Sequence, residues 1–158
     1  RLPGIEFPQA LMAALAGNGG KLFLLGAKPG VAEEAARRLC AAYPGLQIVG
    51  THDGYFTDDA PVTEAIRESG AEVVFVCLGA PKQEKWIAAH GAETGAHLLV
   101  GLGGCLDVFS GNVKRAPVAF QKLGLEWLHR LLKDPRRIGR MMKLPLFMAH
   151  VAGEKRGK

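Results

Sequence analysis

The sequence has little cysteine, few aromatic residues and no long apolar run. Its three cysteines, Cys40, Cys77 and Cys105, form no cluster. This disfavours a disulfide framework and a zinc site, and indicates a reducing compartment. Aromatic residues make up 7% of the chain, which argues against a stacking platform for single-stranded nucleic acid. No apolar stretch of signal-peptide type opens the sequence, and no apolar run approaches the roughly 20 residues that span a bilayer.

Two common nucleotide-binding signatures are also missing. There is no G-x-x-x-x-G-K-[ST] segment, and no G-x-G-x-x-G followed by an acidic residue about 20 positions later. Neither a P-loop nor a dinucleotide-binding Rossmann site is therefore supported. Asp58-Asp59 has no metal-binding context, and no His, Cys or Asp cluster has the spacing of metal ligands. We expect neither a metal nor a bound cofactor.

Glycine, by contrast, is abundant, and charge is unevenly distributed. Glycine accounts for 21 of 158 residues, roughly twice its average share. Residues 1–110 carry 8 Lys and Arg and 12 Asp and Glu, a net charge of −4, whereas residues 111–158 carry 12 and 3, a net charge of +9. This asymmetry indicates a basic segment that meets nucleic acid, an anionic membrane surface or a phosphorylated substrate. A solvated basic face that only maintains solubility is the alternative.

Short apolar runs alternate with amphipathic stretches over the first two thirds of the chain. They predict buried strands at 21–25, 46–50, 72–78 and 97–100, and helices at 31–43, 62–69 and 81–90. Because a helical crossover links successive strands, the predicted fold class is α/β, a Rossmann-like parallel sheet flanked by helices. From Pro117 the strands stop, and helices are predicted at 117–133 and 135–152. We therefore expect two domains, an α/β core over 1–116 and a basic helical C-terminal appendage over 117–158.

Glycine and polar residues follow each predicted strand. The four loops concerned are Gly26-Ala27-Lys28-Pro29-Gly30, Thr51-His52-Asp53-Gly54-Tyr55, Gly79-Ala80-Pro81-Lys82-Gln83-Glu84 and Gly101-Leu102-Gly103-Gly104. Ligands of open parallel sheets bind outside the carboxyl ends of the strands, and the backbone N–H groups of the following helix N-termini suit a phosphate. The loops therefore predict a nucleotide or sugar-nucleotide site.

The loop after the third strand carries the most unusual polar cluster. The Gln83 amide can both donate and accept hydrogen bonds, which suits a pyrophosphate or a sugar hydroxyl, and Glu84 could orient a hydroxyl or a backbone N–H. The alternative is a capped helix with a solvated first turn, where Glu84 also favours the helix dipole. Asp107 lies between apolar neighbours, where a carboxylate is either hydrogen-bonded as a structural cap or part of a site.

The basic residues near the C-terminus are interleaved with leucine, isoleucine and methionine. Four of them are Arg130, Arg136, Arg137 and Arg140. Such a pattern suits a helix that lies on an anionic bilayer, and recognition of phosphate by arginine is a compatible second use. A helix that packs on the core and presents a basic outer face is the alternative.

Together these motifs resemble the WecG/TagA/CpsF family of bacterial glycosyltransferases, over nearly the whole chain. The most specific elements are Gly-x-Pro-x-Gln-Glu-x-Trp at 79–86 and Arg-Ala-Pro…Leu-Glu-Trp between 115 and 127; segments 23–26, 50–56, 107–111 and 134–137 also match. Family members carry a further N-terminal part with an Asp taken as the general base, whereas Arg1 resembles a point in mid-domain. We therefore expect this chain either to be a fragment or to have replaced that base. Leu106 also departs from the family, which usually has an aromatic residue before Asp107.

The resemblance implies transfer of an N-acetylmannosamine-type sugar from a UDP donor to undecaprenyl-diphosphate-linked N-acetylglucosamine. Products of this reaction enter teichoic acid, enterobacterial common antigen or capsular polysaccharide. The implied transfer inverts the anomeric configuration, needs no metal, and occurs at the cytoplasmic face of the bacterial membrane. A non-catalytic module that binds membrane or nucleic acid through its basic tail is the alternative function.

The resemblance also implies roles for individual residues and for partners. Gln83, Glu84 and Asp107 are the expected catalytic residues. The expected donor-binding residues are Gly26, Asp53, Gly54, Tyr55, Gly79, Pro81, Lys82 and Gly103. Arg130, Arg136, Arg137 and Arg140 are expected to bind the lipid diphosphate. The expected partners are the UDP-sugar, the lipid-linked acceptor, an anionic membrane surface and, away from the membrane, a second copy of the chain; nucleic acid is not expected.

Overall fold

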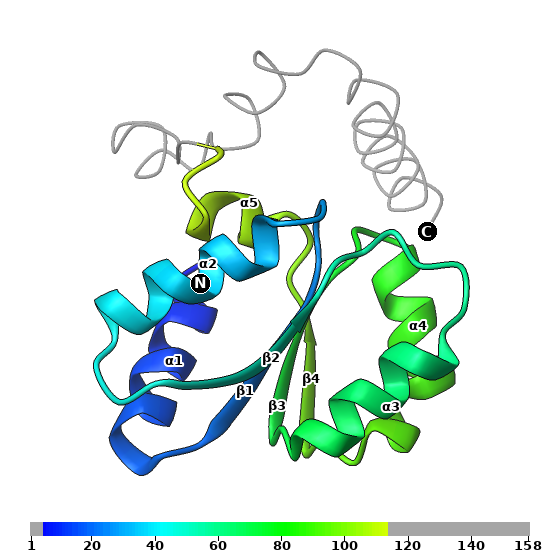
Figure 1. The fold of residues 1–158 in the computed structure, drawn as a ribbon, viewed down its shortest axis with the longest axis horizontal. Helices are drawn as coiled ribbons and strands as arrows, with labels where there is room; N and C mark the ends of the chain where they lie inside the picture. The colour runs from blue at the N-terminus through cyan, green and yellow to red at the C-terminus, as the bar shows by residue number, and fades with distance from the viewer. Residues whose placement is uncertain (1–4, 114–158) are drawn as a thin grey trace, which may run out of the picture. The chain divides into compact units, whose positions relative to one another are not determined.

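A computed structural model describes residues 5–113 of the protein (Figure 1). Helices and strands alternate along these residues in the order α1 (Glu6–Asn18), β1 (Lys21–Gly26), α2 (Val31–Ala42), β2 (Gln47–His52), α3 (Ala60–Ser69), β3 (Val73–Cys77), α4 (Lys82–His90), the 3-10 turn η1 (Gly91–Thr94), β4 (Leu98–Gly101) and α5 (Cys105–Phe109). The predicted helices at 117–133 and 135–152, and the predicted domain boundary after residue 116, lie outside the described residues.

The four strands form one parallel sheet in the order β2-β1-β3-β4. The α/β fold predicted from the sequence is confirmed. The chain moves outward from β1 to β2 and then returns to the other side of β1 to form β3. This reversal places a topological switch point between β1 and β3, where open parallel sheets bind their ligands.

Alternate residues of β1 face two different helical layers. Leu22 and Leu24 pack in the layer of α1, α2 and α5, while Phe23 and Leu25 pack in the layer of α3 and α4. Figure 1 shows these helices on opposite faces of the sheet. All four of these side chains are at most 3% exposed, and burying each of them contributes roughly 1.5–3 kcal/mol. Packing of helices against both faces of the sheet therefore fixes the positions of the strand ends.

Two differences from the predicted elements have clear physical causes. Strand β2 extends to His52 rather than ending at Gly50, because Leu24 and Leu25 of β1 pair with Thr51 and His52. An edge strand tolerates polar side chains such as those of Thr51 and His52, although in the sequence these two residues look like part of a loop. Helix α1 has no counterpart among the predicted elements; it buries only Pro8, Met12 and Leu15, so its apolar stripe is narrow.

Candidate functional site

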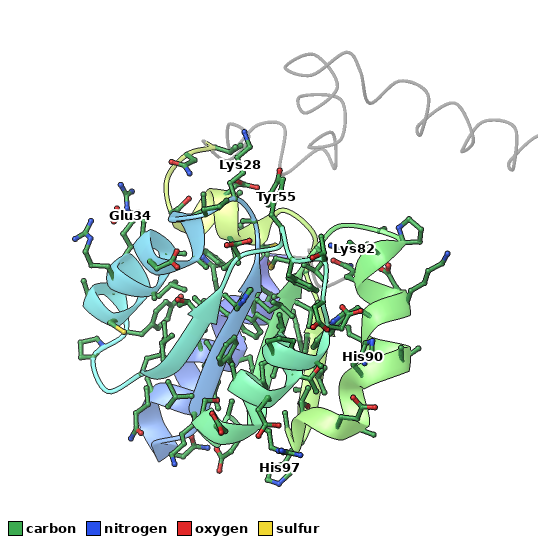
Figure 2. The ribbon with its side chains drawn as sticks, turned by 45° about the vertical axis from the view of Figure 1, so that its right-hand side comes forward. Lys28, Glu34, Tyr55, Lys82, His90 and His97 are labelled. Atoms are coloured by element: carbon green, nitrogen blue, oxygen red, sulfur yellow. The ribbon has the colours of Figure 1, made fainter. Side chains whose placement is uncertain are left out.

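The loops that follow the four strands meet at one edge of the sheet. We call this edge the rim and define it as residues 26–30, 53–59, 78–84 and 102–104. Figure 2 shows Lys28, Tyr55 and Lys82 toward this end of the molecule and His97 at the opposite end. The rim therefore brings together the loops that the sequence singles out, and hydrogen bonds between the loops fix their arrangement.

Gly26, at the end of β1, lies tightly against β3, and Ala27 after it contacts Gly54 in the loop after β2. A Cβ atom on Gly26, whose φ is +126°, would lie 2.4 Å from the carbonyl oxygen of Cys77. A Cβ on Gly54 would lie 3.1 Å from Leu78 and 3.3 Å from the backbone of Ala27. The Gly54 N–H donates to the Ala27 carbonyl at 2.8 Å, and the Ala27 N–H donates to the Cys77 carbonyl at 3.3 Å. Both glycines are thus required for the close packing of the rim.

Asp53 and Tyr55 form the exposed part of the loop after β2. One Asp53 carboxylate oxygen accepts a hydrogen bond from the Tyr55 backbone N–H at 2.7 Å, an arrangement in which the side chain closes the turn. The Tyr55 ring is 69% exposed. Asp53 therefore shapes the loop, and Tyr55 presents an open aromatic surface beside the sheet edge.

Lys82, the first residue of α4, ties the loop after β2 to this helix. Its ammonium donates to the Gly54 carbonyl at 3.1 Å and lies 4.6 Å from the centre of the Phe56 ring. The imidazole of His52 also meets that ring edge-on, at 5.6 Å between centroids. Pro81 occupies the position immediately before the helix. The ammonium of Lys82 is thus engaged within the protein.

Gln83 ties α4 to the loop after β4. Its side-chain oxygen accepts the Gly103 N–H at 2.9 Å, and its amide nitrogen donates to a Glu84 carboxylate oxygen at 2.9 Å. The Gln83 residue is 6% exposed, whereas Glu84 is exposed in the first turn of α4. Gln83 therefore uses both ends of its amide for contacts inside the protein.

Three rim glycines, Gly30, Gly79 and Gly103, face open space. No heavy atom lies within 4 Å of the position that a Cβ would occupy on Gly79 or Gly103. Gly79 precedes α4, whose first-turn N–H groups carry the positive end of the helix dipole. A phosphate group approaching the backbone here would meet no side chain of the glycines themselves.

Asp107 and Cys77 lie where β3 and α5 meet the rim. Asp107 is half-buried in the first turn of α5, and its backbone carbonyl accepts from the Val113 N–H at 2.9 Å and from the Ser110 hydroxyl at 3.2 Å. Burial raises the pKa of the Cys77 thiol from 9.0 to about 12, with a smaller contribution from Cys105. Cys77 is therefore a protonated core residue at neutral pH and no nucleophile.

The predicted site residues fall into two groups. Those brought together on the rim are Gly26, Asp53, Gly54, Tyr55, Gly79, Pro81, Lys82, Gln83, Glu84 and Gly103, with Asp107 in the adjoining helix. Arg130, Arg136, Arg137 and Arg140 lie outside the described residues. Ala27 and Phe56, which the sequence analysis does not assign to the site, also take part. Phe56 is the last residue of the family-like segment at 50–56, and this membership is the signal that could have indicated it.

An open groove of about 440 Å³ runs from the rim along the flank of α4. It is lined by Asp59, Pro81, Lys82, Lys85, Trp86, Ala89 and His90. Within residues 5–113, no group of three or more His, Cys, Asp or Glu side chains is placed to hold a metal ion. Over the same residues, no helix combines the length and apolar character needed to cross a membrane.

Comparison with known proteins relates this arrangement to a family of enzymes. The model of the Glycosyl transferase WecG/TagA/CpsF family matches residues 1–158. Curated relatives from Staphylococcus aureus strains MW2, NCTC 8325 and MRSA252 are each 39% identical over 156 residues, which cover 99% of this chain. Each bears the name N-acetylglucosaminyldiphosphoundecaprenol N-acetyl-beta-D-mannosaminyltransferase. The chain spans 61% of the length of these relatives.

Proposed function

Because this chain belongs to the WecG/TagA/CpsF family of glycosyltransferases, we propose that its rim is the donor site of a hexosyltransferase. The proposed reaction transfers an N-acetylmannosamine-type sugar from UDP to an N-acetylglucosamine that is linked to undecaprenyl diphosphate. The observation that carries this proposal is the family match over all 158 residues. The names of the Staphylococcus aureus relatives specify the acceptor and the transferred sugar for those proteins.

The rim geometry supports a diphosphate donor. Gly79 and Gly103 leave room for the backbone to be approached, and α4 begins three residues after Gly79. We propose that the diphosphate lies at this helix start, where N–H groups stabilise negative charge as the UDP departs. Asp53, Gly54 and Tyr55 then form the neighbouring wall, which suits the rest of the nucleotide sugar.

An inverting transfer also needs a base to take the proton of the acceptor hydroxyl. Glu84 and Asp107 are the carboxylates that we propose for this role among the described residues. Glu84 is exposed next to the proposed diphosphate position, and Asp107 is half-buried in the helix after the Gly103 loop. Replacing each carboxylate by its amide, as in Glu84→Gln and Asp107→Asn, distinguishes the two candidates. The variant that loses the base should transfer sugar far more slowly and still bind the donor.

The basic C-terminal residues suit the lipid-linked acceptor. Residues 111–158 carry a net charge of +9, and juxtamembrane Lys and Arg contribute ~1 kcal/mol each near an anionic surface. We propose that Arg130, Arg136, Arg137 and Arg140 bind the lipid diphosphate, and that the protein works as a peripheral enzyme on the cytoplasmic face of the membrane. Away from the membrane, we propose that the apolar residues among these arginines associate with a second copy.

Sugar transfer to a lipid-linked acceptor tests the proposal. Labelled UDP-N-acetylmannosamine and a short polyprenyl-diphosphate N-acetylglucosamine are incubated with this chain and with the chain extended to the full length of its relatives. We expect a disaccharide-lipid product of inverted configuration, with the extended protein the faster of the two. Vesicle binding without transfer by either protein would instead support a non-catalytic module.

A further inference from the structure

The first turn of α4 reaches both sides of the rim through two consecutive side chains. Lys82 bonds to Gly54 in the loop after β2, and Gln83 bonds to Gly103 in the loop after β4. These partners are 28 and 20 residues away in the sequence. The helix start therefore holds two otherwise separate loops at fixed positions.

Gln83 is enclosed by the protein rather than open to a ligand. The residue is only 6% exposed, its oxygen is occupied by Gly103, and its nitrogen donates to Glu84. The strand β4 also closes on it, since a Cβ atom on Gly101 would lie 2.8 Å from the Gln83 amide nitrogen and 3.1 Å from its amide carbon. Gly101 thus provides the space in which the amide lies.

We propose that Gln83 is a positioning residue, which acts on the donor site by holding the Gly103 loop and not by touching the donor. This inference rests on the proposed function, because it assumes that the Gly103 loop borders the donor. The Gln83 oxygen fixes the direction of the Gly103 N–H, and the Glu84 carboxylate fixes the orientation of the amide. The loop is thereby held open at Gly103 before any ligand arrives, so binding incurs no cost of ordering it.

Exchanging the two polar residues separates positioning from direct contact. The variant Gln83→Glu/Glu84→Gln keeps the net charge, keeps an oxygen at position 83 for the Gly103 N–H, and reverses the second hydrogen bond. We expect the hydrogen-exchange protection of the Gly103 amide to persist and the affinity for UDP to fall less than threefold. If Gln83 donates directly to the diphosphate, the exchange places a carboxylate against it, and UDP affinity falls by at least about 10-fold, as when a hydrogen bond to a charged group is lost.

Gly101→Ala disturbs the same contact while leaving Gln83 in the chain. Its Cβ displaces the flexible end of the Gln83 side chain, so the fold persists while the bond to Gly103 is lost. Gly103 exchange should rise about 5-fold, the value of one hydrogen bond, and UDP affinity should fall by a similar factor. Gln83→Met should reproduce both effects, and the double variant should be no worse than either single one because both remove one interaction.

A matched glycine substitution controls for general effects. Gly17→Ala lies in α1, and its Cβ would meet nothing within 4 Å, so we expect unchanged Gly103 exchange and UDP affinity. Additive losses in the double variant, or a steep loss of UDP affinity in the exchanged pair with Gly103 still protected, would overturn the positioning role. If neither the unsubstituted chain nor the extended protein binds UDP, the proposed function fails instead, and Gly103 exchange still decides whether Gln83 fixes the loop.

Discussion

The substitution Gly54→Ala tests whether the rim is built by close contact between loops. Gly54 donates its N–H to Ala27, accepts from Lys82 at its carbonyl, and faces Leu78. An alanine Cβ would lie 3.1 Å from the Leu78 side chain and 3.3 Å from Ala27 N and O. Because two of these three neighbours are backbone atoms, the loops must move apart by a few tenths of an ångström.

The expected cost follows from two contributions. Overpacking at a tight site costs about 1–3 kcal/mol, and weakening the bond between Gly54 and Ala27 costs about 0.5–1.5 kcal/mol. Together they give a loss of about 1.5–4.5 kcal/mol in the free energy of unfolding. For a chain of this size the loss corresponds to a decrease of roughly 5–15 °C in Tm.

Thermal and urea denaturation measure this loss, and Gly91→Ala supplies the control. Gly91 is helical, and its Cβ would make only ordinary contacts at 3.7–3.8 Å, so we expect a change near zero or a gain of up to ~1 kcal/mol. UDP affinity should also fall in Gly54→Ala, because the loop that carries Asp53 and Tyr55 shifts. A Gly54→Ala protein that is as stable as the unsubstituted chain would refute the packing argument.

Three further predictions concern the cysteines and the basic tail. The folded chain retains the Cys77 proton up to a pKa of about 12, whereas the unfolded chain releases it above pH 9; stability should therefore fall from pH 9 to 12 by up to about 1.4 kcal/mol per pH unit. Cys77→Ala should flatten this slope in alkaline urea denaturation, and an identical slope in both proteins would contradict the assignment. In the native protein only the exposed Cys40 should react rapidly with a thiol reagent at pH 8, since Cys77 and Cys105 are buried. In the tail, the triple substitution of Arg136, Arg137 and Arg140 by Glu should release the protein from anionic vesicles and lower transfer to the lipid-linked acceptor, while UDP affinity persists. If the triple variant still sediments with the vesicles at physiological salt, these arginines do not bind the membrane electrostatically.

The sheet is the part of the fold that the sequence predicts best. Strands β1 and β3 are buried on both faces, so they appear in the sequence as nearly continuous apolar runs with glycine close behind. The edge strand β2 is half-exposed along most of its length, so its end at His52 depends on pairing with β1, which no local pattern reveals. Helix α1 is missed for a similar reason, since tertiary packing stabilises it through a few buried side chains.

The site shows the same division between local and long-range information. Strand ends followed by glycine and polar residues locate the rim, and the parallel topology brings the loops together. The bonds that organise the rim connect residues far apart in the chain, as between Gln83 and Gly103 or between Lys82 and Gly54. Side-chain types alone therefore make Gln83 and Lys82 resemble ligand-binding groups, whereas the structure engages both of them internally.

The charge distribution separates the two anionic ligands of the proposed reaction. Residues 1–110 carry a net charge of −4. Of the two rim lysines, Lys82 is already bonded to Gly54, and Lys28 is exposed. A UDP-sugar at the rim must therefore rely mainly on backbone N–H groups, whose dipoles act at short range. We propose that the lipid diphosphate and the membrane instead interact with the +9 charge of residues 111–158. Salt screens the interaction of exposed charges that lie more than about 10 Å apart. Raising the salt concentration from 50 to 300 mM should therefore weaken vesicle binding severely and UDP affinity only slightly. A parallel decline of both would mean that the donor, too, depends on the basic residues.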